Sequence, residues 1–543
     1  MIIQRFYIIR YVYIFGGLKS MNKFISRKFL ACFIALIFLT VIFSPFSKTT
    51  PIFYGKNEFP LKRIFDLPDP LKLNISLEEA ICRRMSVREF TGEGITNEEL
   101  STILWNAYGF NQNHIRNVHG ITNTYPITIY LLARCGVWRY MPYEHSLILH
   151  SRLDMTWIGQ YDTATVKIGL VWDKNKCVDE NYAGAEIGEI CQNIYFTCNA
   201  LNLGTVTTAG EANQLYFIGL PINEIPMIIM PIGHPKTPYR FTYDPVTSDL
   251  PSIKNSSKSL TEILINRNEA ISWEDSDITL QQQTQVIWSS YGYSYYIDEV
   301  NNKRHKTVPS SHGRYPLTIY SINRTGVYRY KPESHQLLEV KKGDFRKDIA
   351  SVSGGFISAA PLMVIPVLNI SDLDRKYLWV WYYESAASAF NILLESTAWN
   401  LSANIIHITD PGDLAFILGL NSEEWLPMFI IPVGKQKNIE NQPPSVTITQ
   451  PKNGFYFFGN KILDIGRTII IGPFEAKIVA DDDQCFKSIH FYVDGESVKY
   501  SNSQISIFCL PTQFILKRKE LAIEVFDYEG KSSTASVKYF KIF

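Results

Sequence analysis

The sequence has almost no net charge and lacks the common signatures of zinc, nucleotide and hydrolase chemistry. Its 53 lysines and arginines nearly balance 52 aspartates and glutamates, which leaves a formal charge of +1. A balanced charge gives no global field that would favour nucleic acid or anionic lipid. None of the eight cysteines stands in a C-x-x-C pair, which argues against a zinc site. The sequence also contains no phosphate-cradling P-loop and no Ser/His/Asp triad signature.

What the chain does contain is ample material for packed domains. Hydrophobic residues make up 46% of the 543 residues and aromatic residues 13%. This composition argues against extended disorder. The length is sufficient for three ordinary domains.

The N-terminal segment, residues 1–48, predicts a signal peptide or a membrane anchor. A basic start precedes an apolar run at residues 29–43, which is short for a full membrane span. Because no small-x-small cleavage site stands out, we favour a retained anchor over cleavage; a buried core helix is the alternative. The basic residues lie upstream of the run, so the positive-inside rule puts the bulk of the chain outside the cytoplasm. We therefore expect a membrane-anchored or secreted protein, in which Cys485 and Cys509 could form a disulfide.

A tandem duplication organises most of the chain. The block "ITNEELSTILWNAYGF" at residues 95–110 matches "ITLQQQTQVIWSSYGY" at residues 278–293. Three such blocks in the same order, with slowly growing offsets, indicate a duplication followed by loop insertions. The offset grows from 183 to 190 and then 201 residues in the two further matches, "NTYPITIY" at 123–130 with "GRYPLTIY" at 313–320, and "MIIMPIGHPK" at 227–236 with "MFIIPVGKQK" at 428–437.

The two repeats, residues 70–245 and 255–438, each mix helix and strand. Leu100, Ile103 and Leu104 have helical apolar spacing. The sequence predicts an α+β fold rather than a series of βαβ units. The other expected elements of repeat one are a strand at 125–133, a helix at 185–204 that Gly204 would end, and a buried strand at 227–233.

The C-terminal region, residues 443–543, has short alternating strands separated by turns, which predicts a β-sandwich. The pieces "PPSVTITQPKNG", "IHFYVDGE" and "VFDYEGKSS" resemble immunoglobulin-like modules of secreted prokaryotic proteins. That resemblance implies a spacer or adhesion element. The acidic run at residues 481–483 is interpreted as a solvated turn in preference to a calcium site.

A cluster of arginines distinguishes repeat one from repeat two. The stretch "ICRRMSVREF" places three arginines around one serine, whereas Glu269 takes the place of that serine in repeat two. Arginine forks bind phosphate through charge-assisted hydrogen bonds, and a glutamate would repel it. The alternative is a solvated helix start with ordinary ion pairs. The corresponding positions are Arg83, Arg84, Ser86 and Arg88 in repeat one, and Asn266, Arg267, Glu269 and Ile271 in repeat two.

A second motif has the opposite distribution. Repeat two contains "VPSSHGRYP" at residues 308–316, whereas repeat one has "VHGITNTYP" at residues 118–126, without Pro-Ser-Ser. Taken alone, Pro-Ser-Ser is read as a simple turn. Each repeat therefore keeps one motif that the other has lost.

Together these motifs resemble the nitroreductase family, and in particular its thiazole/oxazole-forming peptide dehydrogenase branch. The stretches that carry the resemblance are "RRMSVREFTGEGITNEELSTILWNAYG", "PSSHGRYPLTIY" and "EIGEICQNIYFTCNALNLGTV", and it covers roughly residues 75–437. Members of this family are intertwined dimers that bind FMN at the subunit interface. The resemblance implies that the two repeats form a pseudo-dimer within one chain, and we expect the chain to be monomeric.

The resemblance also implies where the flavin binds. The family takes its Arg-x-Ser-x-Arg from one subunit and its Pro-Ser-Ser from the other, so the retained halves complement each other. We expect one FMN per chain. The implied cofactor-binding residues are Arg83, Arg84, Ser86 and Arg88 with Pro309, Ser310, Ser311 and Gly313, together with Ala209 and Gly210 near the reactive ring edge and His234 and Lys236 near the phosphate or ring.

The expected function is that of an FMN-dependent oxidoreductase, in which the flavin carries the hydride chemistry. NAD(P)H is the candidate electron donor, and the substrate is a small molecule or a peptide. No catalytic acid or base is assigned, although Lys174 and Lys376 lie in the region where the peptide dehydrogenases carry a lysine. The alternative, from another class of protein, is a flavin-free scaffold or adhesion protein at the cell surface.

Overall fold

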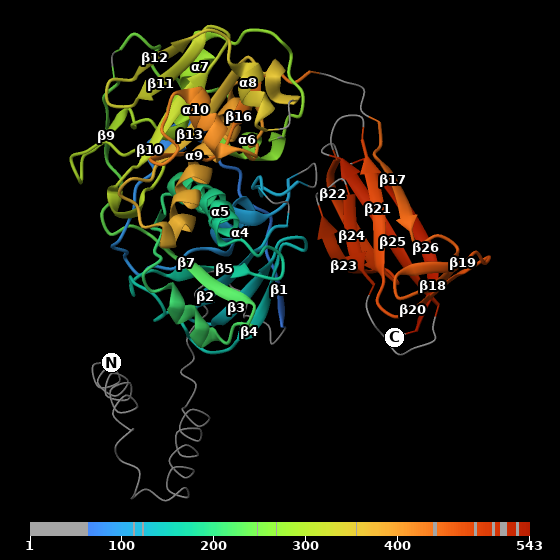
Figure 1. Ribbon diagram of the computed structural model, residues 1–543. Coiled ribbons are helices and arrows are strands. Elements are labelled where there is room, and N and C mark those ends of the chain that lie inside the picture. The colour runs from blue at the N-terminus through green and yellow to red at the C-terminus, as the bar shows by residue number, and fades with distance from the viewer. Residues whose placement is uncertain are drawn as a thin grey trace, which may run out of the picture. The chain divides into compact units, whose positions relative to one another are not determined.

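The computed structural model describes residues 63–542 apart from short gaps, and Figure 1 shows the arrangement of its elements. The predicted N-terminal signal or anchor and Cys485 lie outside the described residues. None of the described helices combines the length and apolarity that a membrane crossing needs. The gaps are residues 112–114, 122–123, 247, 268, 354–355, 438–441, 483–485, 502–504, 511–517 and 528–530.

Repeat one is built on an antiparallel sheet with the strand order β1-β4-β3-β2-β5-β7-β6. Nearly all residues of its central strands β2 and β5 are buried, so both faces of these strands are covered, in keeping with their mostly apolar sequences. Its elements are β1 (Ile64–Asp66), α3 (Leu77–Cys82), α4 (Asn97–Tyr108), β2 (Ile127–Ala133), β3 (Gly136–Met141), β4 (Ser146–Ser151), β5 (Val166–Asp173), α5 (Glu180–Ala200), β6 (Gly204–Thr205), the 3-10 helix η1 (Ala212–Ile218), β7 (Glu224–Gly233) and β8 (Phe241–Tyr243).

Repeat two has a matching antiparallel sheet with the order β12-β11-β10-β13-β16-β14, and β15 pairs with β13. Its elements are α6 (Leu260–Asn266), α7 (Leu280–Tyr291), β9 (Tyr296–Asp298), η2 (Ser311–Gly313), β10 (Leu317–Ile322), β11 (Gly326–Lys331), β12 (Gln336–Lys342), α8 (Arg346–Ser351), η3 (Phe356–Ala359), β13 (Leu362–Asn369), η4 (Arg375–Tyr377), α9 (Leu378–Ala398), β14 (Ser402–Ala403), α10 (Pro411–Leu418), β15 (Trp425–Pro427) and β16 (Ile431–Gly434).

Equivalent helices of the two repeats begin with the same local device. Thr96 caps α4 and Thr279 caps α7, and each threonine side chain accepts a hydrogen bond from the backbone N–H of the third helical residue. In turn, the side chain of that residue, Glu99 or Gln282, accepts a hydrogen bond from the backbone N–H of the capping threonine. This reciprocal capping satisfies backbone N–H groups that a helix start leaves unpaired. The structure therefore confirms that the repeated blocks fold alike.

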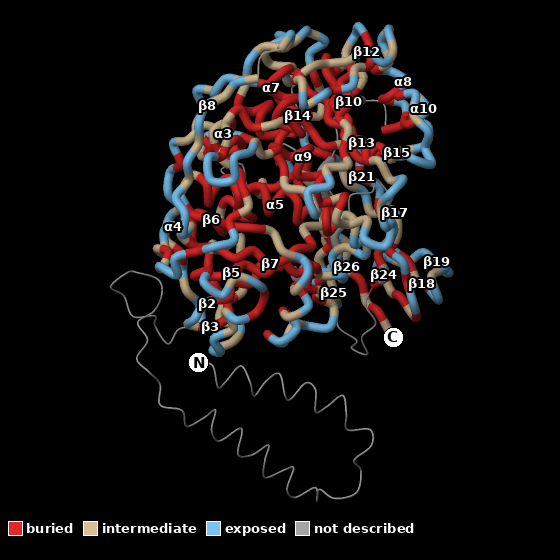
Figure 2. The backbone as a smooth tube through the Cα atoms, turned by 90° about the vertical axis from the view of Figure 1, so that its left-hand side faces the viewer, coloured by how far each residue is buried: buried red, intermediate tan, exposed pale blue. Residues whose placement is uncertain are grey.

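The two repeats share one hydrophobic core around α5 and α9, which pack directly against each other (Figure 1). Figure 2 shows buried backbone along both helices. Close approach depends on Gly184 and Gly188 of α5, because a methyl group at Gly184 would lie 2.5 Å from the carbonyl oxygen of Trp379. A methyl group at Gly188 would overlap the carbonyl oxygen of Tyr383. The site described below lies around these two helices.

The predicted end of the long helix in repeat one is wrong by four residues. Helix α5 ends at Ala200, and Asn202 adopts a left-handed conformation with φ 56°. Gly204 instead begins β6, where a methyl group would lie 2.6 Å from Val87 Cγ1. Asparagine tolerates the left-handed region, so it can end a helix as glycine does.

The C-terminal region is all β and consists of two sheets around their own hydrophobic core, which agrees with the predicted sandwich. The immunoglobulin-like identity stays a prediction. The strands are β17 (Ser445–Gln450), β18 (Gly454–Phe457), β19 (Asn460–Leu463), β20 (Thr468–Ile471), β21 (Glu475–Asp481), β22 (Phe486–Val493), β23 (Glu496–Ser501), β24 (Ile505–Cys509), β25 (Arg518–Asp527) and β26 (Ser532–Ile542).

Candidate flavin site

Arg84 reaches from repeat one into repeat two and is buried there, and no carboxylate among the described residues forms an ion pair with it. Its Nε donates a hydrogen bond to the carbonyl oxygen of Lys306 at 3.2 Å, and its guanidinium lies 5.4 Å from the centre of the Tyr195 ring. The side chain belongs to a residue that is 2% exposed, and its Nη1 has no hydrogen-bond partner among the described residues. Because a buried, unpaired cation is costly, this arrangement suits a bound anion.

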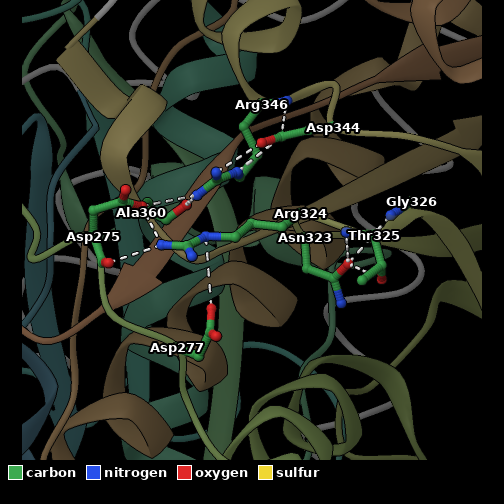
Figure 3. Close-up of polar contacts among 9 residues, drawn as sticks. All are labelled: Asp275, Asp277, Asn323, Arg324, Thr325, Gly326, Asp344, Arg346 and Ala360. Carbon is green, nitrogen blue, oxygen red and sulfur yellow. Dashed lines mark hydrogen bonds and ion pairs between the residues drawn. The ribbon is translucent and has the colours of Figure 1, made fainter.

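The other buried arginines of the described chain are paired with carboxylates, as Arg346 illustrates (Figure 3). Its Nε and Nη2 donate to the two oxygens of Asp344 at 2.9 and 2.8 Å, and its Nη1 lies 3.5 Å from Asp275 Oδ1. These donors hold the pKa of Asp344 below its ordinary value. Arg346 is therefore a satisfied structural group, in contrast to Arg84.

We expect Asp344→Ala to lower the free energy of unfolding by about 2 kcal/mol, because Arg346 would lose two charge-assisted hydrogen bonds while remaining buried. Denaturation in urea measures this loss. Asp277→Ala is the matched control, since Asp277 is well exposed and makes one long contact of 3.6 Å with Arg324. An equal loss in both variants would contradict the assignment of Arg346 as a buried, carboxylate-dependent group.

The segment that follows α3, residues 83–90, is called the arginine loop below. Tyr195 of α5 joins the arginine loop to the loop that follows β6. Its hydroxyl lies 3.4 Å from Ser86 Oγ and accepts a hydrogen bond from the Thr207 backbone N–H at 3.0 Å. Thr207 Oγ1 also lies 3.1 Å from the hydroxyl of Tyr383 on α9. Ala209 and Gly210 follow in the same loop, and a methyl group at Gly210 would meet no atom within 4 Å. Hydrogen bonds thus hold the loop in place at Thr207, whereas there is free space beside Gly210.

The remaining residues predicted in repeat one divide into two groups. His234 and Lys236 lie beside the arginine loop, because the backbone N–H of Thr91 donates to the His234 carbonyl oxygen at 2.9 Å. Lys236 Nζ is paired with Glu89 Oε2 at 3.4 Å, and Arg88 is exposed. Arg83 is not brought to this group: it forms an ion pair with Glu79 of its own helix and lines a separate polar groove.

The Pro-Ser-Ser segment of repeat two is fixed by a buried glutamate. Ser310 Oγ donates to Glu384 Oε2 at 2.7 Å and accepts from the Tyr315 backbone N–H at 2.9 Å. Tyr291 donates to the other oxygen of Glu384. Burial raises the pKa of Glu384 to about 7, although the two hydroxyl donors oppose the shift. Downstream of Ser310, Gly313 has φ 67°, and a methyl group on it would meet no atom within 4 Å.

The two predicted halves therefore lie next to each other, because Arg84 bonds to the backbone of Lys306, three residues before Pro309. The side chain of Tyr315 is close enough to Arg84 and Glu384 for their charges to act on its pKa, which burial raises. Tyr195 and Glu384 were not predicted from the sequence, because their contacts join segments far apart in the chain.

The pseudo-symmetric position in the other half is closed by an internal ion pair. Arg267, at the position of Arg84, donates to the carbonyl oxygens of Arg116 and Val118. Its Nη1 donates to Glu269 Oε1 at 2.9 Å, and both side chains are buried. Glu269 stands where repeat one has Ser86. The positive charge of Arg267 is thus neutralised by Glu269, whereas no described carboxylate pairs with Arg84.

Neither lysine considered in the sequence for a base role contributes to this cluster among the described contacts. Lys174 lies over the ring of Trp172, and Lys376 lies over the ring of the adjacent Tyr377. The catalytic residue therefore stays unassigned.

Comparison with known proteins identifies the family. The nitroreductase family model matches residues 81–234 and again residues 274–435, so the chain belongs to the nitroreductase family and carries its domain twice. A protein of Methanocaldococcus jannaschii that bears a nitroreductase name is 32% identical over 181 residues, which cover 29% of this chain and 91% of that protein.

Two solved structures are similar to parts of this chain. A nitroreductase structure from Anabaena variabilis matches with a TM-score of 0.52 at 11% identity, over 70% of this chain and 93% of that one. A nitroreductase from Desulfovibrio desulfuricans, solved in complex with FMN, covers 33% of this chain and 86% of its own, with a TM-score of 0.24 at 14% identity. The two family matches and the Anabaena variabilis structure confirm the predicted α+β fold of two nitroreductase-like repeats.

Proposed function

We propose that the protein is an FMN-dependent oxidoreductase that binds a single flavin between its two repeats. The observation that carries this proposal is the difference between Arg84 and Arg267. Both are buried at equivalent positions, but within the part of the chain that the structure describes only Arg267 is paired with a carboxylate. A phosphate monoester would supply the negative charge that Arg84 lacks. At the equivalent position of repeat two, the carboxylate of Glu269 pairs with Arg267 and would repel a phosphate. This supports one flavin per chain.

Residues from both repeats would bind the cofactor. Arg84, Ser86 and Arg88 would hold the phosphate, and Ser310 with the open backbone at Gly313 would hold polar edges of the flavin. The open loop at Ala209 and Gly210 would lie near the ring. When bound, FMN supplies hydride transfer. The contribution of the chain is to bind and orient the cofactor, with Tyr195 and Glu384 fixing the binding loops.

The finer parts of the proposal rest on the sequence. We keep NAD(P)H as the electron donor and a small molecule or peptide as the substrate, in keeping with the resemblance to the peptide dehydrogenase branch. We also keep a membrane-anchored or secreted chain, with the C-terminal region as an immunoglobulin-like spacer.

Titration of the full chain with FMN tests the proposal, with flavin fluorescence and absorbance as readouts. We expect one equivalent to bind. Arg84→Met should weaken binding about 100-fold, because it removes charge-assisted hydrogen bonds worth about 3 kcal/mol. The matched control is the double variant Arg267→Met/Glu269→Met, which removes the equivalent guanidinium together with its counter-ion and should still bind one FMN.

Two outcomes would contradict the proposal. Binding of two equivalents would show that the Arg267 position also takes a flavin. Failure of the folded wild-type chain to bind FMN would favour a flavin-free scaffold. Circular dichroism of each variant separates a lost site from a lost fold.

A further inference from the structure

Two buried glutamates, one from each repeat, meet in the core that the repeats share. Glu78 of α3 and Glu395 of α9 are both completely buried, and their side chains are hydrogen-bonded to each other. Two carboxyl groups can form such a bond only when one of them carries a proton. Among the other described residues, Glu395 Oε2 has no donor. Without a shared proton, two negative charges would lie side by side in the core, which is costly.

Hydrogen bonds hold both carboxyl groups in fixed positions. Glu78 Oε1 accepts from the backbone N–H of Ser256 at 2.9 Å and from the indole N–H of Trp399 at 3.0 Å. Glu395 Oε1 accepts from Gln285 Nε2 at 2.9 Å. Gln285 is in turn bonded to the backbone of the segment that precedes α6. The pair thus connects α3 of repeat one with α7, the end of α9 and the segment before α6.

The other half of the molecule satisfies the equivalent backbone group without a carboxyl group. The offset of 183 residues places Thr261 at the position of Glu78, and Thr261 Oγ1 accepts from the backbone N–H of Leu73 at 2.7 Å. Helices α5 and α9 are both 21 residues long, and aligning them places Thr197 at the position of Glu395. The fold therefore does not need acidic side chains at these positions. What the glutamates add, and the threonines lack, is a group that titrates.

Burial is the main reason why the pair keeps a proton. It raises the pKa of Glu395 well above its ordinary value, and the charge of Glu78 acts in the same direction, whereas the N–H groups of Gln285 and Trp399 oppose the shift. The other titratable or charged groups around the pair are Glu79 and Arg83 of α3, which pair with each other, Lys258 before α6, whose Nζ donates to the carbonyl oxygen of Thr397, Glu262 of α6, which acts on Lys258, and Tyr295 after α7.

We propose that Glu78 and Glu395 share one proton at neutral pH, and that losing this proton at higher pH weakens the contact between the two repeats. The proton leaves to solvent, and the two like charges that remain in the core repel each other. Because α3 ends directly before the arginine loop, the same contact fixes where that loop begins. The inference does not depend on the binding of FMN.

Urea denaturation of the full chain at pH 5, 6 and 7 tests the proposal, with Glu395→Gln as the decisive variant. The glutamine amide can donate to Glu78 as the protonated carboxyl group does, but it does not titrate. The folded pair keeps a proton that the unfolded chain releases above a pH of about 4.3. Raising the pH therefore favours unfolding of the wild type. We expect its unfolding constant to rise, relative to that of the variant, by about tenfold per pH unit.

Infrared spectroscopy of the same proteins gives a second readout. At pH 7 the wild-type spectrum should contain the band of a protonated carboxyl group that is missing from the spectrum of Glu395→Gln. Raising the pH further should remove this band. Other buried glutamates such as Glu384 contribute to both spectra, so the difference between the two proteins isolates Glu395.

Glu423→Gln is the matched control, because Glu423 is exposed, and it should leave the pH dependence of wild-type unfolding unchanged. Glu395→Thr, which copies Thr197 of the other half, is a second variant and should also lose the dependence. The proposal is overturned if the ratio of the wild-type and Glu395→Gln unfolding constants is the same at pH 5 and pH 7, or if their infrared spectra coincide. Neither measurement involves FMN, so this inference and the proposed function can fail separately.

Discussion

Gly188→Ala is expected to destabilise the protein by about 3 kcal/mol or more, although alanine is the better residue in an isolated helix. The added methyl group would overlap the backbone carbonyl oxygen of Tyr383, and backbone cannot move aside as a flexible side chain can. Accommodating it requires α5 and α9 to separate. Because these helices lie in the core that both repeats share, separation would disturb packing on both sides of the interface.

Urea denaturation followed by circular dichroism measures this effect. Gly210→Ala is the control for stability, because its new methyl group would meet no atom within 4 Å and its backbone is not left-handed. We expect that control to stay within about 0.5 kcal/mol of wild type. A more stable Gly188→Ala protein, as helix propensity alone would give, would contradict the close packing of α5 on α9.

Arg267→Met is expected to cost about 4 kcal/mol of stability, because it leaves Glu269 buried without its counter-ion. The substitution also removes the donors to the carbonyl oxygens of Arg116 and Val118. In the double variant Arg267→Met/Glu269→Met, no buried charge is left unpaired, and we expect at least about 2 kcal/mol of the loss to be recovered.

Thermal and urea unfolding of the single and double variants measure this coupling. Ile271→Ala serves as a nearby control that removes no charge. If the double variant is as unstable as Arg267→Met alone, the ion pair is not what fills this position. A stable single variant would likewise contradict the assignment.

The repeated blocks of the sequence predicted the correspondence between the two halves well. The offset of 183 residues places Arg267 at the position of Arg84, and both side chains indeed bond to the backbone of the other repeat. Local sequence sufficed here because a duplication preserves the spacing of residues within each block.

Contacts between distant segments could not be predicted in the same way. Arg83 and Arg84 are adjacent and chemically identical, but Arg83 pairs with Glu79 on its own helix, whereas Arg84 crosses to repeat two. Which of two neighbouring side chains crosses depends on the path of the backbone after α3. Likewise, Ser310 bonds to Glu384, which lies 74 residues further along the chain on α9, and nothing in the local sequence of either residue predicts this contact.

Joining the two halves in one polypeptide removes a constraint that symmetry imposes on a homodimer. When identical subunits form two sites, every substitution occurs in both, so a glutamate at the position of Glu269 would also replace Ser86. In this chain each position can change alone. Covalent linkage also keeps the halves together at any dilution. The position of Arg267 and Glu269 can thus be selected for stability alone, while the position of Arg84 and Ser86 can be selected for what it binds.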